Sequence, residues 1–206
     1  MRQLESLRAL LSMNRVVLTT RESATLWHTE IRTASRRLRA LERAGFLRQL
    51  RRGLWTLDPQ IDPYVVAPFL TAPLPAYVSF ASALSHHEMI EQIPRQIAVA
   101  SVDRPQKVET AVGTFSIHRL APKMFGGFEG SAENGYIARP EKALFDTVYT
   151  KAAAGGQAFL PELTLSAQFD NDAAWGWVNR IEGKRLKTIV SRHLLDTLRH
   201  AKRDPA

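Results

Sequence analysis

Four arginines recur at helical spacing between residues 30 and 44, and their chemistry is that of anion binding. They follow in steps of four, three and four, so a helix would carry all of them on one face: Arg32, Arg36, Arg39 and Arg43. Like charges one turn apart cost a helix stability. Such a stripe is favoured where the phosphates of a nucleic acid lie against it. We therefore expect this segment to bind a polyanion.

The same segment has an apolar stripe that would hold the helix on a core. Ile31, Ala34, Leu38 and Leu41 follow in steps of three, four and three. Gly45 then provides a stop, because glycine readily adopts the left-handed conformation that ends many helices. We expect a helix from about residue 30 to 44, with its apolar stripe inward and its arginines outward.

Two predicted helices precede this one, and a predicted hairpin follows it. Leucines at helical spacing indicate a helix over residues 3–12, and Thr19 stands three residues before Glu22, the spacing of a capping box that begins a second helix. Two strand-like runs, 46–50 and 54–57, flank a glycine-containing turn. Helix, helix, helix and hairpin is the order of a winged helix-turn-helix, whose third helix enters the major groove of DNA.

Within a winged helix-turn-helix, the position of each residue indicates which part of the DNA it would contact. Residues near the start of a recognition helix reach base edges, so the base-contact candidates are Thr29, Arg32, Thr33, Arg36 and the flanking Arg37. Residues further along the helix and at the tip of the wing hold the DNA backbone, and those candidates are Arg39, Arg43, Arg51 and Arg52. The expected partner is double-stranded DNA.

The distribution of charge along the chain favours this assignment. Residues 1–57 hold twelve arginines, no lysine and four carboxylates, which gives +8, the formal net charge of the whole protein. Residues 58–206 hold sixteen basic and sixteen acidic side chains. Two other interpretations of the arginine-rich helix stay open: a solvated surface and a winged helix that binds another protein.

Composition excludes several kinds of site and location. The chain has no cysteine, so disulfides and thiolate metal sites are ruled out, and a reducing cytoplasm is expected. The first residues lack the apolar centre of a secretory signal. The longest uncharged run, residues 63–85, contains four prolines that would break a membrane helix. We expect it to be a buried connection, and we expect no membrane partner.

A break in pattern separates the basic head from the rest of the chain. It predicts a winged helix-turn-helix domain at residues 1–57, a proline-containing linker at 58–63 and a second domain at 64–206. Within the second domain we expect helices over 79–90, from Pro140 onward and over 184–201, a buried strand at 96–102, a hairpin of 108–112 with 114–120, and a short strand at 136–138. This irregular mixture predicts an α+β fold overall.

The second domain contains five collinear segments of distinctive sequence: YVSFASALSHH at Tyr77–His87, the segment Met89–Pro94, GTFSIH at Gly113–His118, the run Leu120–Phe128, and IARPEKALFD at Ile137–Asp146. Together these segments resemble the AbiEi family of antitoxins. The head, with its wing sequence Arg52–Trp55, is similar to the N-terminal winged helix of that family. The resemblance covers most of residues 1–150, and beyond it extends to Leu160–Leu163.

The resemblance implies a bacterial protein with two jobs. The N-terminal domain would repress its own operon by binding inverted repeats in the promoter. The C-terminal domain would neutralise a nucleotidyltransferase-like toxin encoded nearby, with direct contact left open, as in a type IV toxin–antitoxin system. The alternatives are a stand-alone transcription regulator whose second domain senses a ligand, and an enzyme, such as a nuclease, that uses the head for targeting.

Other patterns are better explained by structure than by chemistry. His86 and His87 are adjacent, so on a helix they point about 100° apart and do not easily share a metal ion. The glycine-rich turn Phe125–Gly130 lacks the lysine and hydroxyl residue of a phosphate-binding loop. Glu141, near Asp146, is explained by the favourable placing of acids at a helix start. We therefore expect no enzyme, with no catalytic residue, cofactor or metal site.

Overall fold

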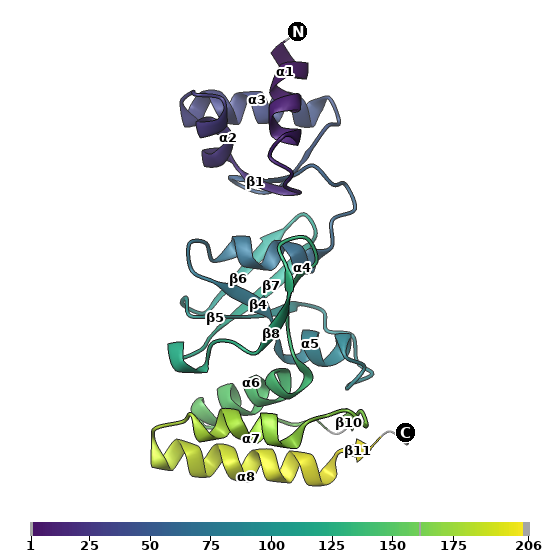
Figure 1. Cartoon of the computed structure of the whole chain (residues 1–206), viewed down its shortest axis with the longest axis vertical. Coiled ribbons are helices and arrows are strands. Elements are labelled where there is room, and N and C mark those ends of the chain that lie inside the picture. The colour runs from purple at the N-terminus through teal and green to yellow at the C-terminus, as the bar shows by residue number, and fades with distance from the viewer. Residues whose placement is uncertain (1, 161, 204–206) are drawn as a thin grey trace.

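The computed structural model describes residues 2–160 and 162–203, and it has an α+β fold, as expected from the sequence. Figure 1 shows that the layers follow one another along the longest axis: an N-terminal head, a central sheet, and a group of helices at the far end. The head and the last helix thus lie at opposite ends of the molecule (Figure 1).

The elements of the head follow the predicted order, with one additional strand. They are α1 (Arg2–Leu11), β1 (Val17–Thr19), α2 (Thr20–Leu26), α3 (Ile31–Arg43), β2 (Arg48–Arg51) and β3 (Leu54–Thr56). The antiparallel hairpin of β2 and β3 is joined by β1, which pairs antiparallel with β3, so the sheet order is β1-β3-β2. The apolar residues before Thr19 form that extra strand.

Local chemistry explains where the helices of the head begin and end. The predicted capping box is present: the Glu22 amide donates to the Thr19 hydroxyl at 3.1 Å, and the Thr19 amide donates to the Glu22 carboxylate at 2.8 Å. Gly45, with φ +80°, ends α3 in the left-handed conformation, and Gly53, with φ +84°, turns the hairpin. These positions disfavour a residue with a Cβ.

The core of the head is a separate apolar cluster. It contains Leu10, Leu18, Leu38, Leu41, Leu47 and Trp55. The indole Nε1 of Trp55 donates to the Thr20 hydroxyl at 2.8 Å, so this buried ring has its polar atom satisfied. One core prediction is wrong: Ile31 is 54 % exposed, because it lies in the first turn of α3, beyond the end of the packed stripe.

The body is built on a six-stranded mixed sheet. In spatial order its strands are β6 (Gln106–Thr110), β7 (Gly113–Arg119), β5 (Ile97–Ser101), β4 (Ala76–Val78), β9 (Gly135–Ala138) and β8 (Phe128–Ser131). The pairs β5·β7 and β4·β9 are parallel, and the other neighbours are antiparallel. The predicted hairpin is β6–β7. Strand β4 lies in the centre of the sheet, so part of the expected connection is a core strand.

Helices cover both faces of this sheet. The head side has α4 (Pro63–Val66) and a 3₁₀ turn (Ala67–Leu70). The other side has α5 (Phe80–His86), α6 (Pro140–Ala153), α7 (Asn171–Asn179) and α8 (Lys184–His200), with a 3₁₀ turn at Pro122–Met124 and the short parallel pair β10 (Thr164–Leu165) and β11 (Lys202–Arg203). Helix α5 is shorter than the predicted 79–90, because Glu88 adopts φ +57° after it.

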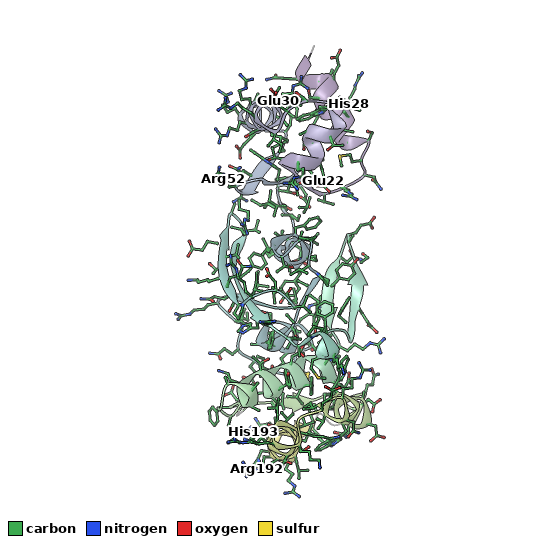
Figure 2. All side chains as sticks on the ribbon, turned by 90° about the vertical axis from the view of Figure 1, so that its left-hand side faces the viewer. Glu22, His28, Glu30, Arg52, Arg192 and His193 are labelled. Carbon is green, nitrogen blue, oxygen red and sulfur yellow. The ribbon has the colours of Figure 1, made fainter. Side chains whose placement is uncertain are left out.

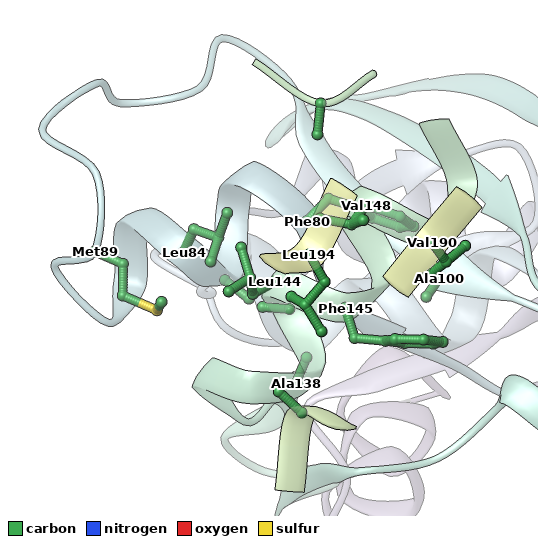
Figure 3. Close-up of a cluster of buried hydrophobic side chains, with 14 of the residues drawn as sticks. Phe80, Leu84, Met89, Ala100, Ala138, Leu144, Phe145, Val148, Val190 and Leu194 are labelled. Carbon is green, nitrogen blue, oxygen red and sulfur yellow. The ribbon is translucent and has the colours of Figure 1, made fainter. Parts of the chain in front are cut away.

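Alternation along the strands divides the body into two apolar clusters. Tyr77, Ala98 and Ala100 face the cluster under α5–α8, while Val78 and Val99 face the cluster under α4. Figure 2 shows side chains filling the space on both sides of the sheet. Figure 3 shows part of the larger cluster, where Leu144 and Phe145 of α6 lie close to Leu194 of α8. Among the described residues, no helix has the length and apolar character that a membrane span requires.

The head contacts the body directly at the β2–β3 hairpin. The Ala111 amide, in the β6–β7 turn, donates to the Leu50 carbonyl at 2.8 Å, and the Arg48 guanidinium donates to the Ala111 carbonyl at 2.7 Å. Leu50 and Val17 of the head also belong to the apolar cluster around α4. The body therefore supports β2, the first strand of the hairpin.

Candidate nucleic-acid interface

Four of the candidate side chains form one exposed face of α3. Arg32, Arg36, Arg39 and Arg43 are all exposed. At 3.6 residues per turn they lie within an arc of about 60°. This arc is opposite the buried stripe of Ala34, Leu38 and Leu41, which packs on the core of the head. The stripe that anchors the helix thus aims the arginines at solvent.

The start of α3 is set by the turn that follows α2. The Thr29 amide donates to the Ala24 carbonyl at 3.0 Å, and His28 adopts φ +47°, so the chain reverses tightly between the two helices. Thr29 and Thr33 are half-buried. The hydroxyl of Thr33 accepts a hydrogen bond from Arg36 at 3.4 Å. The polar base-contact candidates therefore lie beside the arginine face, at its N-terminal end.

Arg37 differs from the other candidates. Although it is exposed, it lies about 100° around the helix from Arg36, outside the arc. Its guanidinium is 5.7 Å from the centre of the Trp27 ring, at the end of α2. This contact is of the cation–π kind. Arg37 thus has a partner within the head and is set apart from the stripe.

The β2–β3 hairpin carries two further arginines at its tip. Arg51 and Arg52 are exposed, and the Thr20 amide donates to the adjacent Gly53 carbonyl at 2.9 Å. This bond ties the tip of the hairpin to the first residue of α2. In Figure 2, nitrogen-tipped side chains project from the left-hand side of the head, and Arg52 lies on that side.

Within the described residues, the arginines of this face form no ion pair with a carboxylate. Within the described part of the head, Arg15 and Glu22 form the one ion pair, at 2.6 Å. The carboxylate of Glu42, on α3, accepts from the Gln49 amide at 2.8 Å and so serves the hairpin. The face of α3 is therefore an unneutralised cationic surface of a kind suited to phosphates.

The sequence did not single out two other arginines of the head that lie close to α3 or to the hairpin. Arg21 is exposed in the first turn of α2 and lines the groove between α2 and the start of α3. Arg48 bonds the head to the body. Neither belongs to a periodic stripe, so spacing alone could not single them out.

The body holds a second, very different group of charges. The Asp146 carboxylate is fully buried and pairs with the Lys142 ammonium one helical turn earlier on α6. It also accepts hydrogen bonds from Ser79 Oγ at 2.7 Å and Tyr77 Oη at 3.0 Å. The ammonium donates in addition to the Met124 carbonyl at 2.8 Å. Every group of this network has a partner inside the protein.

Burial governs protonation in this network. It raises the pKa of Asp146 and lowers the pKa of Lys142, and the attraction between the two groups opposes both shifts. Burial, with the nearby carboxylate, also raises the pKa of Tyr77, so its hydroxyl stays a donor. The acidic pair of a nuclease would need accessible carboxylates, and Asp146 is enclosed. Glu141 is engaged elsewhere, accepting from the Asp170 amide at 3.0 Å.

A cleft of about 970 Å³ lies beside this network. It is lined by the Phe125–Glu129 segment, the start of α6 and the outer side of α7. A Cβ on Gly127, which has φ +72°, would lie 2.6 Å from the Trp177 ring, so the glycine permits this close packing. The Arg180 guanidinium lies 4.0 Å from the centre of the same ring. The glycine-rich turn thus packs closely against α7 at the edge of the cleft.

The adjacent histidines His86 and His87, and His118 on β7, each contact another group of the body. His87 Nε2 donates to the Ala138 carbonyl at 2.8 Å, which joins α5 to β9. The exposed His86 ring packs edge-on against it, with 5.2 Å between centres. His118 Nε2 lies 3.1 Å from the Ser116 hydroxyl, and burial lowers the pKa of His118.

No protein-family model matches this chain, and no curated protein matches it either.

Proposed function

We propose that this protein is the DNA-binding antitoxin of a bacterial toxin–antitoxin pair and acts in the cytoplasm. In this proposal residues 1–57 form a winged helix-turn-helix that represses the protein's own operon at inverted repeats in the promoter. The body neutralises a nucleotidyltransferase-like toxin encoded nearby. The first role is argued from the head itself, and the second from the resemblance to AbiEi antitoxins.

The observation that carries the DNA-binding role is the exposed, unpaired arginine face of α3. A helix with an anchored inner stripe and a cationic outer face, preceded by α2 and followed by a hairpin, matches the way a winged helix presents its third helix to the major groove. Arg32 and Arg36, with Thr29 and Thr33 beside them, would reach base edges. Arg39, Arg43, Arg51 and Arg52 would hold phosphates.

Support for the antitoxin role comes from how the segments that carry the resemblance meet. Tyr77 and Ser79 belong to the first quoted segment, Met124 to the Leu120–Phe128 run, and Lys142 with Asp146 to the last. All five take part in the one buried network. The segments quoted for the resemblance thus meet in the core of the body, and the toxin-contacting residues are left to experiment.

A paired reporter and rescue experiment tests both roles in full-length protein. The variant Arg32→Ala, Arg36→Ala, Arg39→Ala and Arg43→Ala removes exposed charge without touching a core. We expect it to lose repression of a reporter behind the protein's own promoter, and to keep rescuing cells that express the neighbouring toxin gene. A matched variant carrying Arg95→Ala, Arg104→Ala and Arg119→Ala, all exposed on the body, should keep repression.

Two results would overturn the proposal. Repression that survives the loss of all four arginines would remove the role of α3. A neighbouring gene product that is harmless to cells, or toxic but not countered by this protein, would remove the antitoxin role.

The cleft beside α7 favours one alternative, a transcription regulator that senses a ligand. Its volume of about 970 Å³ is of the size that small-molecule sites have. Under this alternative, a small molecule would release the protein from its operator, and the variant Gly127→Leu, which would push into the Trp177 ring, would abolish that response. Operator binding that no cell metabolite extract changes would count against it.

A further inference from the structure

The body has equal numbers of basic and acidic side chains, but they are unevenly distributed and leave a second cationic surface. Between Lys184 and Arg203, along α8 and β11, there are seven basic side chains and one carboxylate, Asp196, which gives a net charge of +6. The remainder of residues 58–206 is correspondingly acidic. The net positive charge of the body is thus concentrated at the end of the molecule opposite the head (Figure 1).

The outward face of α8 is formed largely by these cations. Lys184, Arg185, Arg192 and Arg199 are exposed, and at 3.6 residues per turn they lie within an arc of about 100°. The opposite side of α8 carries Val190 and Leu194, which are buried against α6. In Figure 2, Arg192 projects away from the body at the lower end.

Helix stability does not explain this arrangement. Like charges repeat along the face, which costs a helix stability. The first turn of α8 holds basic residues and no acid, against the preference of a helix start for negative charge. The N-cap residue, Gly183, provides no side-chain cap. Among the described residues, none of the four cations of this face has an ion-pair partner, and neither does Asp196.

The chemistry of the face fits phosphates better than a protein partner. Stable protein interfaces have an apolar, often aromatic centre with little charge. Among the large apolar residues of α8, only Leu195 is substantially exposed, at 38 %, and the others are buried or half-buried. A row of cations without an apolar centre is the composition that suits the backbone of a nucleic acid.

We propose that the outward face of α8 is a second DNA-contact surface, which binds the phosphates of duplex DNA regardless of sequence. Within residues 2–160 and 162–203, no hairpin adjoins α8 that would act as a wing, so its cations contact the backbone and leave the bases unread. This surface adds non-specific affinity to the sequence-reading head. It extends the proposed function and does not depend on it, because α8 lies at the other end of the molecule.

Duplex binding in a head-disabled background tests this surface. The background is the full-length chain with the four α3 arginines changed to alanine, and the probe is a mixed-sequence duplex of roughly three helical turns. Adding Arg185→Gln, Arg192→Gln and Arg199→Gln should reduce the slope of log K against log salt by about 2.7, from about 0.9 per cation. Affinity at low salt should fall at least tenfold. The matched control Arg95→Gln, Arg104→Gln and Arg119→Gln should leave both unchanged.

Other outcomes would overturn the proposal. Equal slopes for the α8 variant and the control would show that α8 does not contact DNA. Binding of poly-glutamate through α8 as tightly as the duplex would assign the face to an acidic protein partner. The head is judged separately: if the intact and head-disabled proteins bind a selected operator equally, the role of α3 fails while the α8 result stands. Thermal unfolding of each variant checks that it remains folded.

Discussion

Charge is used in opposite ways on α3 and on α6. The arginines of α3 are exposed and have no carboxylate partner within the described residues. Lys142 and Asp146 of α6 are buried, paired with each other and hydrogen-bonded to further groups of the body. Both sets are unusual placements of charge, but only the first leaves interaction capacity for another molecule. We therefore distinguish a proposed binding set, the exposed arginines of the head, from a building set, the residues that hold the fold together.

The two sets also differ in what their loss should do. An exposed, unpaired cation contributes little to folding, so its removal should be felt in binding. A buried ion pair gains little net stability over an apolar pair, yet removing one partner is costly, because the remaining charge is uncompensated. Substituting a residue therefore shows whether it belongs to the binding set, when DNA affinity falls, or to the building set, when stability falls.

The largest effect is expected for Lys142→Met. This change leaves the Asp146 carboxylate buried with two hydrogen-bond donors and no counter-charge. We expect the free energy of unfolding to fall by roughly 3–5 kcal/mol at neutral pH. The double variant Lys142→Met and Asp146→Asn should recover part of this loss, since the amide oxygen can still accept from Ser79. Urea unfolding monitored by circular dichroism measures both variants.

The same variant should show a characteristic pH dependence. Burial already raises the pKa of Asp146 in the intact protein, and without Lys142 nothing in the pair opposes this shift. The folded variant then holds a proton that the unfolded chain releases above its ordinary pKa of about 3.8. The cost of Lys142→Met should therefore be small in acid and grow as the pH rises toward neutrality. A cost that does not change with pH would contradict this account.

The second prediction compares Arg36→Ala with Arg37→Ala. The two residues are adjacent and lose the same charge, but Arg36 lies on the exposed face and Arg37 lies over Trp27. We expect Arg36→Ala to weaken operator binding by about 1–3 kcal/mol and to relax preference at one base position. Arg37→Ala should have a clearly smaller effect on binding. Titration of each variant against a selected operator and its single-base variants measures affinity and base preference. Equal losses of affinity for the two variants would mean that binding depends on the charge alone and not on its position on the helix.

The exposed face of α3 could be predicted from the sequence better than the buried network around Asp146. The face of α3 follows from steps of three and four along one helix, and the Thr19–Glu22 cap from a local spacing, so both needed no tertiary information. Asp146 contacts Tyr77 and Ser79, which lie 69 and 67 positions earlier in the chain, only once β4 pairs with β9 in the mixed sheet. No local pattern carries that contact.

Other parts of the fold were missed for related physical reasons. Strand β4 has three residues and lies within a proline-rich run, so its place in the sheet is decided by its neighbours β5 and β9. Helix α7 has a Gly and two tryptophans in nine residues, which gives a weak helical pattern. The basic face of α8 does not show in the net charge of the body, because an equal excess of carboxylates elsewhere in residues 58–206 cancels it. The α+β fold itself could be predicted, since the longer helices and strands have clear periodicity.

A smaller effect, on stability, is expected for Thr19→Ala. It removes the hydroxyl that accepts from the Glu22 amide and so breaks the capping box of α2. We expect a loss of about 1 kcal/mol in the free energy of unfolding. Thr19→Ser, which keeps the hydroxyl, should lose far less. Because Thr19 belongs to the building set, DNA affinity measured well below the unfolding temperature should not change; a loss of affinity without a loss of stability would place this residue in the binding set instead.

The smallest effect is expected at the wing, from Arg51→Gln or Arg52→Gln. Each removes one exposed cation that we assign to the DNA backbone. The slope of log K against log salt should fall by about 0.9 for each change, which is about a threefold difference in affinity over a fourfold range of salt. Since phosphates carry no sequence information, operator and unrelated duplex should weaken alike. Arg48→Gln gives the matched contrast: its guanidinium bonds to the Ala111 carbonyl, so it should lower stability and leave the salt slope unchanged. A sequence-dependent loss at Arg51 would instead make the wing part of the base-reading surface.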